Sequence, residues 1–449
     1  MIKKAVALFS SLLILCTALP PAAAQAAVFH IDFPTYSEAI ELVNLDTGTP
    51  VYEKNPNERR EPASVTKVMT YIIVSEHIKD LQGTKITVQR KILDELSGTG
   101  SSMSGIHVGD VVTAFQLMNC MMVPSGNDAA LTLADYIGGG DEQKFVDMMN
   151  AKAKALGCTN THFTNPHGLH DDNHYTTAAD LVKITRYAMT LPYFMEICSQ
   201  LGYSYKPIGG PHAGQTTTLT TTNRMLISSD SKYYYCYAKG IKTGHTDESG
   251  YCLVSTASAE GYSYLCVALG SPSVDKSGKS IDTHGEMLDS ASLYRWALTK
   301  LELKKIVGPG DTLGEISLNY AWKKDTLRLQ PEKSYSAILP KDVSASSVIV
   351  TKNIPKSINA PVKKGQVVGT ATLSYANEKL ATINLVASES AERSELLHTT
   401  DVAKSIFTSK WFLVIAGIVI LLIIIYIILA IIYNRKRKRL RRVKHYRKM

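Results

Sequence analysis

Apolar residues recur at helical spacing in three segments of the first third of the chain. In the segment 64–78, one face of the expected helix carries five of them: Val65, Val68, Met69, Ile72 and Ile73. The same pattern predicts helices over residues 112–123 and 141–156.

Patterns typical of strands occur later in the chain, between residues 233 and 270. Residues 250–270 form two apolar runs joined by a short turn that contains Gly261, which is typical of two paired strands. The segment 233–246 is a third candidate strand. Strands late in the domain, with helices before and after them, predict an α+β domain over residues 28–301, built on an antiparallel sheet flanked by helices.

Beyond residue 301 the pattern changes to short apolar runs separated by turns. These runs predict a small all-β domain over residues 302–388, and residues 375–378 resemble the tip of a hairpin. The predicted strands lie in five places: 325–330, 334–339, 346–353, 366–375 and 379–387. A polar stalk is expected over residues 389–410.

The N-terminus has the features of a secretory signal peptide. Lys3 and Lys4 precede a short apolar run, which small residues follow up to Ala26. This order predicts a signal peptide over residues 1–26, cleaved after Ala24 or Ala26. The six cysteines beyond it permit disulfides in an oxidising compartment, but their spacing shows no metal pattern and assigns no pairing.

The C-terminal apolar segment is long enough to cross a membrane. Residues 411–433 carry no charge, and a bilayer core of roughly 30 Å needs about 20 apolar residues in a helix. The tail 434–449 follows with ten Lys and Arg residues and no acid. Because basic segments stay on the cytoplasmic side, we expect a single-pass protein of the cell membrane with its body outside and its tail cytoplasmic.

The basic tail also explains the charge of the whole chain. The formal net charge is +9, and it becomes slightly negative once the tail and the signal peptide are set aside. The basic composition therefore reports membrane topology and contact with anionic lipid. It gives no reason to expect a nucleic-acid partner.

The stretch EPASVTKVMTY, residues 61–71, contains the first candidate chemistry. Ser64 and Lys67 are three residues apart, so they share one face of the predicted helix. A serine near a helix N-terminus meets backbone N–H groups that favour developing negative charge. Its hydroxyl needs a base, and a lysine can serve only if burial or a neighbouring positive charge lowers its pKa.

The spacing S-x-x-K is weak alone, since residues 229–232 and 273–276 also satisfy it in polar, turn-rich stretches. Two further motifs follow Ser64 in order: Ser125-Gly126-Asn127, in a loop after a helix, and Lys242-Thr243-Gly244, in a strand before a hairpin. This ordered set is the signature of β-lactamases and penicillin-binding proteins. The three motifs together predict a serine acyl-enzyme site.

On these motifs the chain resembles the serine-type D-alanyl-D-alanine carboxypeptidases, which are low-molecular-mass penicillin-binding proteins. The stretches KTGHTDESGYCLVSTA, FTNPHGL and TTNRML extend the resemblance over about residues 33–296, and PVKKGQVVGTATL extends it into the β domain. It implies a β-lactamase/transpeptidase-like fold and removal of the terminal D-alanine from the peptidoglycan stem pentapeptide. It also implies acylation by β-lactam antibiotics and no cofactor.

The resemblance further implies the roles of the catalytic residues. Ser64 would attack the carbonyl of the penultimate D-alanine, with Lys67 as the base. Ser125 would relay a proton to the leaving D-alanine. Asn127 would hold Lys67 and bind the substrate amide.

A second group would bind the substrate along the strand. Lys242 and Thr243 would hold the terminal carboxylate, and Gly244 would leave room for an extended peptide. The backbone N–H groups of Ser64 and His245 would form the oxyanion hole.

The segment 161–180 is rich in His and Asp. His167, His170, Asp171 and His174 form an alternative metal site, but their spacing is loose, and we favour a loop over the active site without metal. Asp180 is expected to cap or pair near the helix that follows.

Two alternative functions remain open at this point. A β-lactamase of the same fold is disfavoured because residues 158–180 contain no glutamate to activate water. A non-catalytic scaffold that binds peptidoglycan is disfavoured because the set of motifs is complete.

Overall fold

The computed structural model describes residues 29–275, 277–322 and 324–446, which form two compact units. The first unit contains residues up to 306 together with 336–349 and 373–381, and the second contains the remainder. The predicted signal peptide lies outside the described residues. The predicted domain limits, 28–301 and 302–388, stay predictions.

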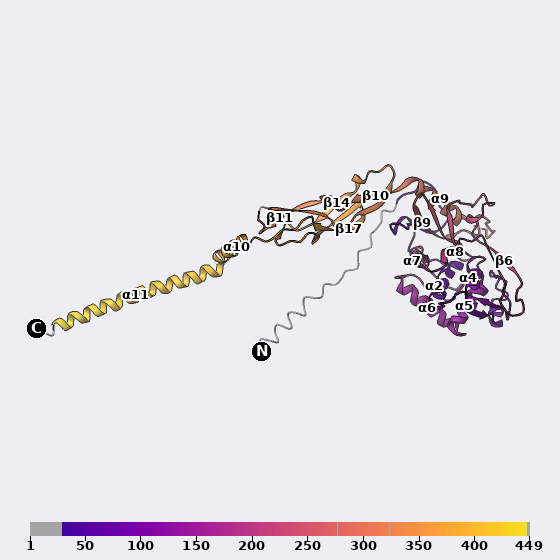
Figure 1. The fold of residues 1–449 in the computed structure, drawn as a ribbon, viewed down its shortest axis with the longest axis horizontal. Helices are drawn as coiled ribbons and strands as arrows, with labels where there is room; N and C mark the ends of the chain where they lie inside the picture. Colours follow the sequence, from indigo (N-terminus) through magenta and orange to yellow (C-terminus); the bar gives the residue numbers. More distant parts are fainter. Residues whose placement is uncertain (1–28, 276, 323, 447–449) are drawn as a thin grey trace. The chain divides into compact units, whose positions relative to one another are not determined.

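A five-stranded antiparallel sheet forms the centre of the first unit (Figure 1). Its strand order is β2-β1-β9-β8-β7. Because successive side chains point to opposite faces, the sheet contributes to two separate cores. The strands are β1 (Ala39–Asn44), β2 (Thr49–Lys54), β7 (Ala238–Thr246), β8 (Gly250–Ala259) and β9 (Tyr262–Ser271).

Helices cover both faces of this sheet, which confirms the predicted α+β class. One core joins one face to most of the helices, and the other joins the opposite face to α9 (Gly285–Lys300). The helices of the larger group are α2 (Lys67–His77), α4 (Ala114–Met122), α5 (Asn127–Gly138), α6 (Glu142–Ala155), α7 (Ala178–Ala188) and α8 (Phe194–Cys198).

Short elements connect this framework. A 3-10 turn, η1 (Ala63–Thr66), leads into α2, and another, η2 (Arg224–Leu226), precedes β7. The helix α3 (Arg90–Leu96) packs its apolar residues against Leu131 of α5. Two small hairpin-like pairs complete the unit: β3 (Lys85–Thr87) with β4 (Val111–Thr113), and β5 (Gly202–Tyr205) with β6 (Thr217–Thr220).

The structure corrects three predicted boundaries. The helix predicted over residues 64–78 begins as α2 only at Lys67, because residues 63–66 form the 3-10 turn η1. The segment 112–123 begins as β4, and α4 begins only at Ala114, because Thr113 and Gln116 form a reciprocal capping box at that point. The third predicted strand begins at Ala238, not at residue 233. The predicted helix over 141–156 is confirmed, with Asp141 as its N-cap.

The predicted all-β region beyond residue 301 is confirmed. A six-stranded sheet has the order β14-β16-β17-β12-β11-β15, and β10 pairs with β13. Ala376 and Asn377 have φ of 49° and 68°, so the predicted hairpin tip between β16 and β17 is a left-handed turn. The elements are β10 (Leu301–Val307), β11 (Gly314–Asn319), β12 (Thr326–Pro331), β13 (Tyr335–Pro340), η3 (Ala345–Ser347), β14 (Ile349–Asn353), β15 (Ser357–Asn359), β16 (Val367–Tyr375) and β17 (Glu378–Ala387).

Two helices end the chain. α10 (Glu395–Thr408) lies within the predicted stalk and begins at the N-cap Ser394. α11 (Lys410–Tyr446) contains Lys410–Arg437, which among the described residues is the one stretch long and apolar enough to cross a membrane. The six cysteines of the described chain are free thiols, and five of them are buried.

Candidate active site

The predicted nucleophile and base meet at the junction of η1 and α2. Ser64 lies in η1, and Lys67 is the first residue of α2. The Lys67 Nζ lies 2.7 Å from Ser64 Oγ, 2.6 Å from Asn127 Oδ1 and 2.8 Å from the carbonyl oxygen of His167. These three contacts fix the amine beside the serine hydroxyl.

The surroundings of Lys67 favour its neutral form. The side chain is fully buried, and this burial lowers its pKa well below the usual value for lysine. The nearby charge of Lys242 lowers the pKa of Lys67 further, while the Asp128 carboxylate acts in the opposite direction. An uncharged amine 2.7 Å from a hydroxyl can accept its proton.

The S-x-N motif lies at the start of α5. Ser125 and Asn127 are both buried, and Ser125 has a left-handed φ of 70°, which is a strained conformation typical of functional sites. Gly126 is required between them, because a Cβ there would lie 2.7 Å from the carbonyl oxygen of Cys120. The backbone therefore places Asn127 against Lys67.

The strand β7 approaches the nucleophile closely at Gly244. A Cβ at Gly244 would lie 2.8 Å from the Pro62 carbonyl oxygen and 3.1 Å from Ser64 N. A glycine is therefore needed at position 244 because β7 packs closely against η1 there. Thr243 precedes Gly244 on the same strand, and its hydroxyl lies 2.5 Å from the hydroxyl of Thr222.

Lys242 lies beneath the surface of the strand. Its side chain is 1% exposed, and its Nζ donates to the Thr243 carbonyl oxygen at 2.8 Å. Burial lowers the pKa of Lys242 to about 7. Lys242 does not line the cleft, whereas Thr243 does. When charged, Lys242 can therefore act on a ligand only through its electrostatic potential.

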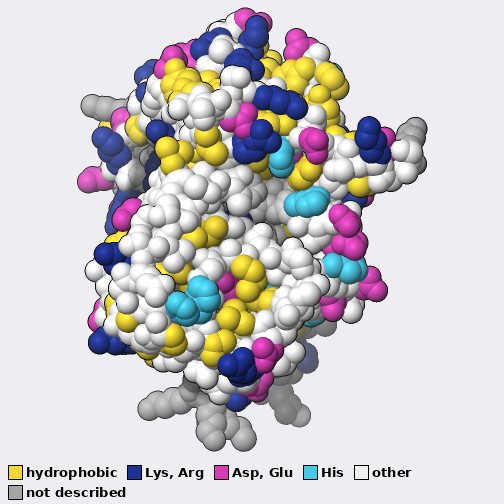
Figure 2. Space-filling model, turned by 90° about the vertical axis from the view of Figure 1, so that its right-hand side faces the viewer, with side chains coloured by type: hydrophobic (Ala, Val, Ile, Leu, Met, Phe, Trp, Pro, Cys, Tyr) yellow, Lys and Arg dark blue, Asp and Glu magenta, His cyan; other side chains and the backbone are white. Residues whose placement is uncertain are grey.

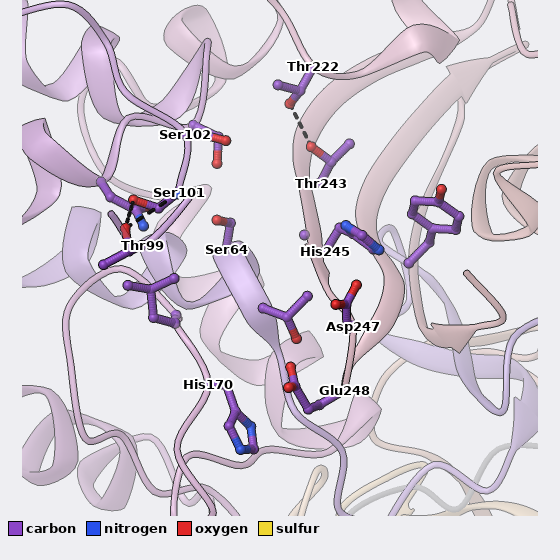
Figure 3. Close-up of a pocket in the computed structure, with 18 of the residues that line it drawn as sticks. Ser64, Thr99, Ser101, Ser102, His170, Thr222, Thr243, His245, Asp247 and Glu248 are labelled. Carbon is purple, nitrogen blue, oxygen red and sulfur yellow. Dashed lines mark hydrogen bonds between the residues drawn. The ribbon is translucent and has the colours of Figure 1, made fainter. Parts of the chain in front are cut away.

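A cleft of about 640 Å³ brings most of the predicted residues together. Ser64, Ser125, Asn127, Thr243, Gly244 and His245 line it, whereas Lys67 and Lys242 lie behind its wall. Two further histidines, His170 and His284, also line it, and Figure 2 shows several exposed histidines on the face turned to the viewer. In Figure 3, Ser64 lies between Thr99 and Ser101 on one side and Thr243 with His245 on the other.

Several residues of the cleft carry no motif and escaped the sequence analysis. A loop supplies Thr99, Ser101 and Ser102, and the turn after β7 supplies Asp247 and Glu248. Thr222 also lines the cleft. Thr222 belongs to the stretch TTNRML, and Asp247 and Glu248 belong to KTGHTDESGYCLVSTA, so these three lie in stretches that carried the resemblance, although no role was predicted for them.

The segment 161–180 packs over α2, in agreement with the predicted loop over the site. The Pro166 carbonyl oxygen accepts a hydrogen bond of 2.5 Å from Thr70, and that of His167 accepts one from Lys67. Farther along, Gly168, Leu169 and His170 reach the cleft.

The alternative metal site in this segment loses its ligands to other contacts. Both ring nitrogens of His174 are engaged, Nε2 by Thr66 at 2.7 Å and Nδ1 by Thr164 at 3.1 Å. His167 Nδ1 accepts the Leu169 N–H at 3.2 Å. Asp180 pairs with Lys183 at 2.9 Å, close to the start of α7, as predicted.

The arrangement defines a class of protein. A serine beside a buried lysine, an asparagine that holds the lysine, and a cationic strand next to the serine N–H are the parts of a serine acyl-transfer site. β-Lactamases and penicillin-binding proteins share this set of motifs. The class alone does not decide between them.

Comparison with known proteins narrows the class to one family. Residues 30–273 match the family described as D-alanyl-D-alanine carboxypeptidase, and residues 301–393 match the C-terminal domain of penicillin-binding protein 5. The chain belongs to the D-alanyl-D-alanine carboxypeptidase family.

Individual relatives agree with this assignment. The chain is 28% identical over 353 residues to D-alanyl-D-alanine carboxypeptidase DacF of Bacillus subtilis (strain 168), covering 79% of this chain and 85% of the relative. It is 30% identical over 384 residues to DacD of Salmonella typhimurium, covering 83% and 91%. The solved structure of DacD from Francisella tularensis matches with a TM-score of 0.64 and 29% identity, covering 82% of this chain and 96% of that one.

Proposed function

We propose that the chain is a membrane-associated, penicillin-sensitive carboxypeptidase that removes the terminal D-alanine from peptidoglycan stem pentapeptides. The observation that carries this proposal is the 2.7 Å contact between Ser64 Oγ and a buried lysine amine of lowered pKa. Family membership supports the choice of substrate.

Acylation in the cleft would take two chemical steps, nucleophilic attack and cleavage of the peptide bond. Ser64 Oγ attacks the carbonyl carbon of the penultimate D-alanine as Lys67 Nζ takes the hydroxyl proton. The backbone N–H groups of Ser64 and His245 stabilise the oxyanion, and each lowers the barrier by about 3 kcal/mol. The peptide C–N bond then breaks, and Ser125 gives its hydroxyl proton to the leaving nitrogen and regains one from Lys67, which becomes neutral again.

Release of the product requires water. A water molecule attacks the ester carbonyl as Lys67 takes one of its protons, the C–Oγ bond breaks, and Lys67 returns that proton to Ser64. With a β-lactam, the leaving nitrogen stays attached to the acyl group after ring opening, so it remains in the cleft. The absence of a glutamate between residues 158 and 180 agrees with slow release of such adducts and with a carboxypeptidase instead of a β-lactamase.

Binding of the terminal carboxylate would fall to the strand. The Thr243 hydroxyl lines the cleft and can donate a hydrogen bond, and the buried Lys242 supplies positive potential behind it. Asn127, 3% exposed and bonded to Lys67, can offer its amide N–H₂ group to the substrate backbone.

The C-terminal apolar helix associates the protein with a membrane. We place the first unit outside the cell and the basic tail in the cytoplasm, because basic segments flanking a single span stay on the cytoplasmic side. This orientation puts the cleft in the compartment that contains peptidoglycan.

Labelled penicillin tests the proposal directly. The wild-type protein is expected to bind it covalently, Ser64→Ala to bind none, and Lys67→Ala to react at least about 100-fold more slowly, as for removal of a catalytic base. Ser204→Ala is a matched control, since its hydroxyl bonds Thr218 on an exposed hairpin outside the cleft. Equal labelling of wild type and Ser64→Ala would refute the nucleophile.

The two alternative functions give different results in the same preparation. A β-lactamase would turn over penicillin rapidly and release no D-alanine from a pentapeptide. A non-catalytic scaffold would neither be labelled nor release D-alanine.

A further inference from the structure

Two histidines and an aspartate converge outside the active-site cleft. His107 and Asp110 belong to the loop before β4, and His212 belongs to the loop between β5 and β6. The Asp110 carboxylate lies 3.0 Å from His212 Nδ1 and 3.6 Å from His107 Nδ1. The two imidazole rings face each other with centroids 4.2 Å apart.

The aspartate is the buried member of this group. Asp110 is 1% exposed, and its oxygens accept the backbone N–H groups of His107 at 3.1 Å and His212 at 3.2 Å. A carboxylate offers about four lone pairs, so these two bonds leave acceptor capacity on both oxygens. The backbone therefore fixes the carboxylate between the two rings.

We propose that His107, Asp110 and His212 bind one divalent transition-metal ion, for which Zn²⁺ is the best match. Imidazole nitrogens and a carboxylate oxygen are ligands that Zn²⁺ accepts, with bonds of about 2 Å. Donor atoms that share such an ion lie about 3 to 3.5 Å apart, and here 3.0 Å separates Asp110 Oδ1 from His212 Nδ1 and 3.6 Å separates Oδ2 from His107 Nδ1. One donor atom from each of the three residues already lies within 4.8 Å of the others.

Small side-chain movements complete the site. The His107 side chain is 58% exposed and that of His212 is 35% exposed, so both rings can turn without displacing core residues. Water would fill the coordination positions that the three residues leave open.

The ion would join two loops, one of which belongs to the active site. The loop that carries His107 also supplies Ser102, whose carbonyl oxygen accepts the Asn127 N–H at 2.8 Å. In the same loop, the Ser104 N–H donates to Asp128 at 2.9 Å. Metal binding at His107 and His212 would therefore stiffen a wall of the cleft without touching the substrate.

Two other groups of possible ligands are less suited. Glu61, His170 and Glu248 offer no buried carboxylate to hold an ion, and His170 and Glu248 line the active-site cleft. In the other group, His167 is buried and its Nδ1 is engaged by Leu169. The group at Asp110 alone combines a buried carboxylate with two accessible imidazoles among the candidate groups of the described chain.

Calorimetric titration of Zn²⁺ tests the site on the full-length protein in detergent, purified without a histidine tag and stripped of metal. The wild type is expected to bind one equivalent. His107→Gln and His212→Gln should each weaken binding by at least about tenfold. His77→Gln is the matched control, an exposed histidine outside the group that should bind Zn²⁺ as the wild type does.

Thermal unfolding gives a second readout. Zn²⁺ should raise the midpoint of the wild type and of His77→Gln, and have less effect on the other two variants. Uptake of labelled penicillin by each variant verifies its fold. The proposal is wrong if the wild type binds no Zn²⁺, or if His107→Gln and His212→Gln bind it as tightly as His77→Gln.

Discussion

Two lysines of the candidate site are buried, and the proposed mechanism needs them in different charge states. In that mechanism Lys67 is neutral so that it can accept a proton, whereas Lys242 is charged so that it attracts a carboxylate. Each is held by carbonyl or amide oxygens, and no carboxylate pairs directly with either amine among the described residues. Burial therefore lowers both pKa values, and the charge of Lys242 helps to keep Lys67 neutral.

This division predicts a bell-shaped pH profile for D-alanine release. On the acid side, kcat/KM falls as Lys67 gains its proton. On the alkaline side, it falls through about pH 7, where Lys242 loses its charge in the free enzyme. Lys242→Arg should remove the alkaline limb, because a guanidinium stays protonated. An alkaline limb that persists unchanged in Lys242→Arg would assign it to another group.

Gly244 provides a geometric test of the oxyanion hole. In Gly244→Ala, the new Cβ would lie 2.8 Å from the Pro62 carbonyl oxygen, so β7 must move away from η1. That movement separates the His245 N–H from the Ser64 N–H, and loss of one such donor lowers the rate about 100-fold or more. The rate of penicillin acylation measures it. Gly138→Ala is the control, because its Cβ meets Phe145 at an ordinary 3.8 Å, and equal rates in both variants would contradict the geometry.

The residues that the sequence singled out are those that belong to short motifs. Of the eight predicted site residues, six line one cleft, and the remaining two, Lys67 and Lys242, are buried next to it. The burial of Lys242 and the packing of Gly244 on η1 depend on contacts between segments about 180 residues apart in the chain. Such contacts leave no local pattern, so the sequence could name these residues without their surroundings. Their catalytic roles stay predictions.

At the scale of elements, the helix α5 links the Ser125-Gly126-Asn127 motif to the loop that carries Ser102 and Ser104. The Asp128 carboxylate, in the first turn of this helix, accepts the Ser104 N–H and hydroxyl at 2.9 Å and the Ala129 N–H at 2.9 Å. A carboxylate near a helix N-terminus also interacts favourably with the helix dipole. Asp128 therefore holds the loop that carries Ser102 against α5.

Asp128→Ala should loosen this loop. The Ser104 N–H would lose its acceptor in a buried position, which costs about 1–3 kcal/mol of stability. We expect a lower thermal midpoint and faster hydrogen exchange in the loop 97–110. Asp147→Ala serves as the control, since Asp147 is exposed on α6 and bonds only Gln143 in the described structure. A midpoint for Asp128→Ala equal to that of the control would contradict this role.

The sequence predicted the helices and strands that have a clear periodicity of apolar residues. It was less accurate for elements whose ends are set by polar side-chain contacts. The strands β8 and β9 and the helix α6 lie where their patterns indicated. The start of α4 depends on a capping box, and β11 and β15 are too short or too polar to stand out. Tertiary pairing therefore determines the elements that the sequence missed.

At the scale of the whole molecule, the sequence separates catalysis from attachment. The motifs of the cleft all lie between residues 64 and 245, whereas the apolar span begins at Lys410. Truncation after residue 409 should move the protein from the membrane fraction to the soluble fraction and leave its rate of penicillin labelling within about twofold. Retention on membranes after truncation would point to another attachment.

The basic tail gives the last prediction, the orientation of the span. Arg435, Lys436 and Arg437 follow the apolar stretch after a single asparagine, and moving such a cluster across a bilayer is unfavourable. An epitope fused after Met449 should resist protease in intact spheroplasts and be digested after permeabilisation, while the penicillin-labelled unit is digested in both. The labelled unit is the internal control, because it shows that the protease is active outside the cell. Loss of the epitope in intact spheroplasts would place both ends of the span on the outer side and exclude a single crossing.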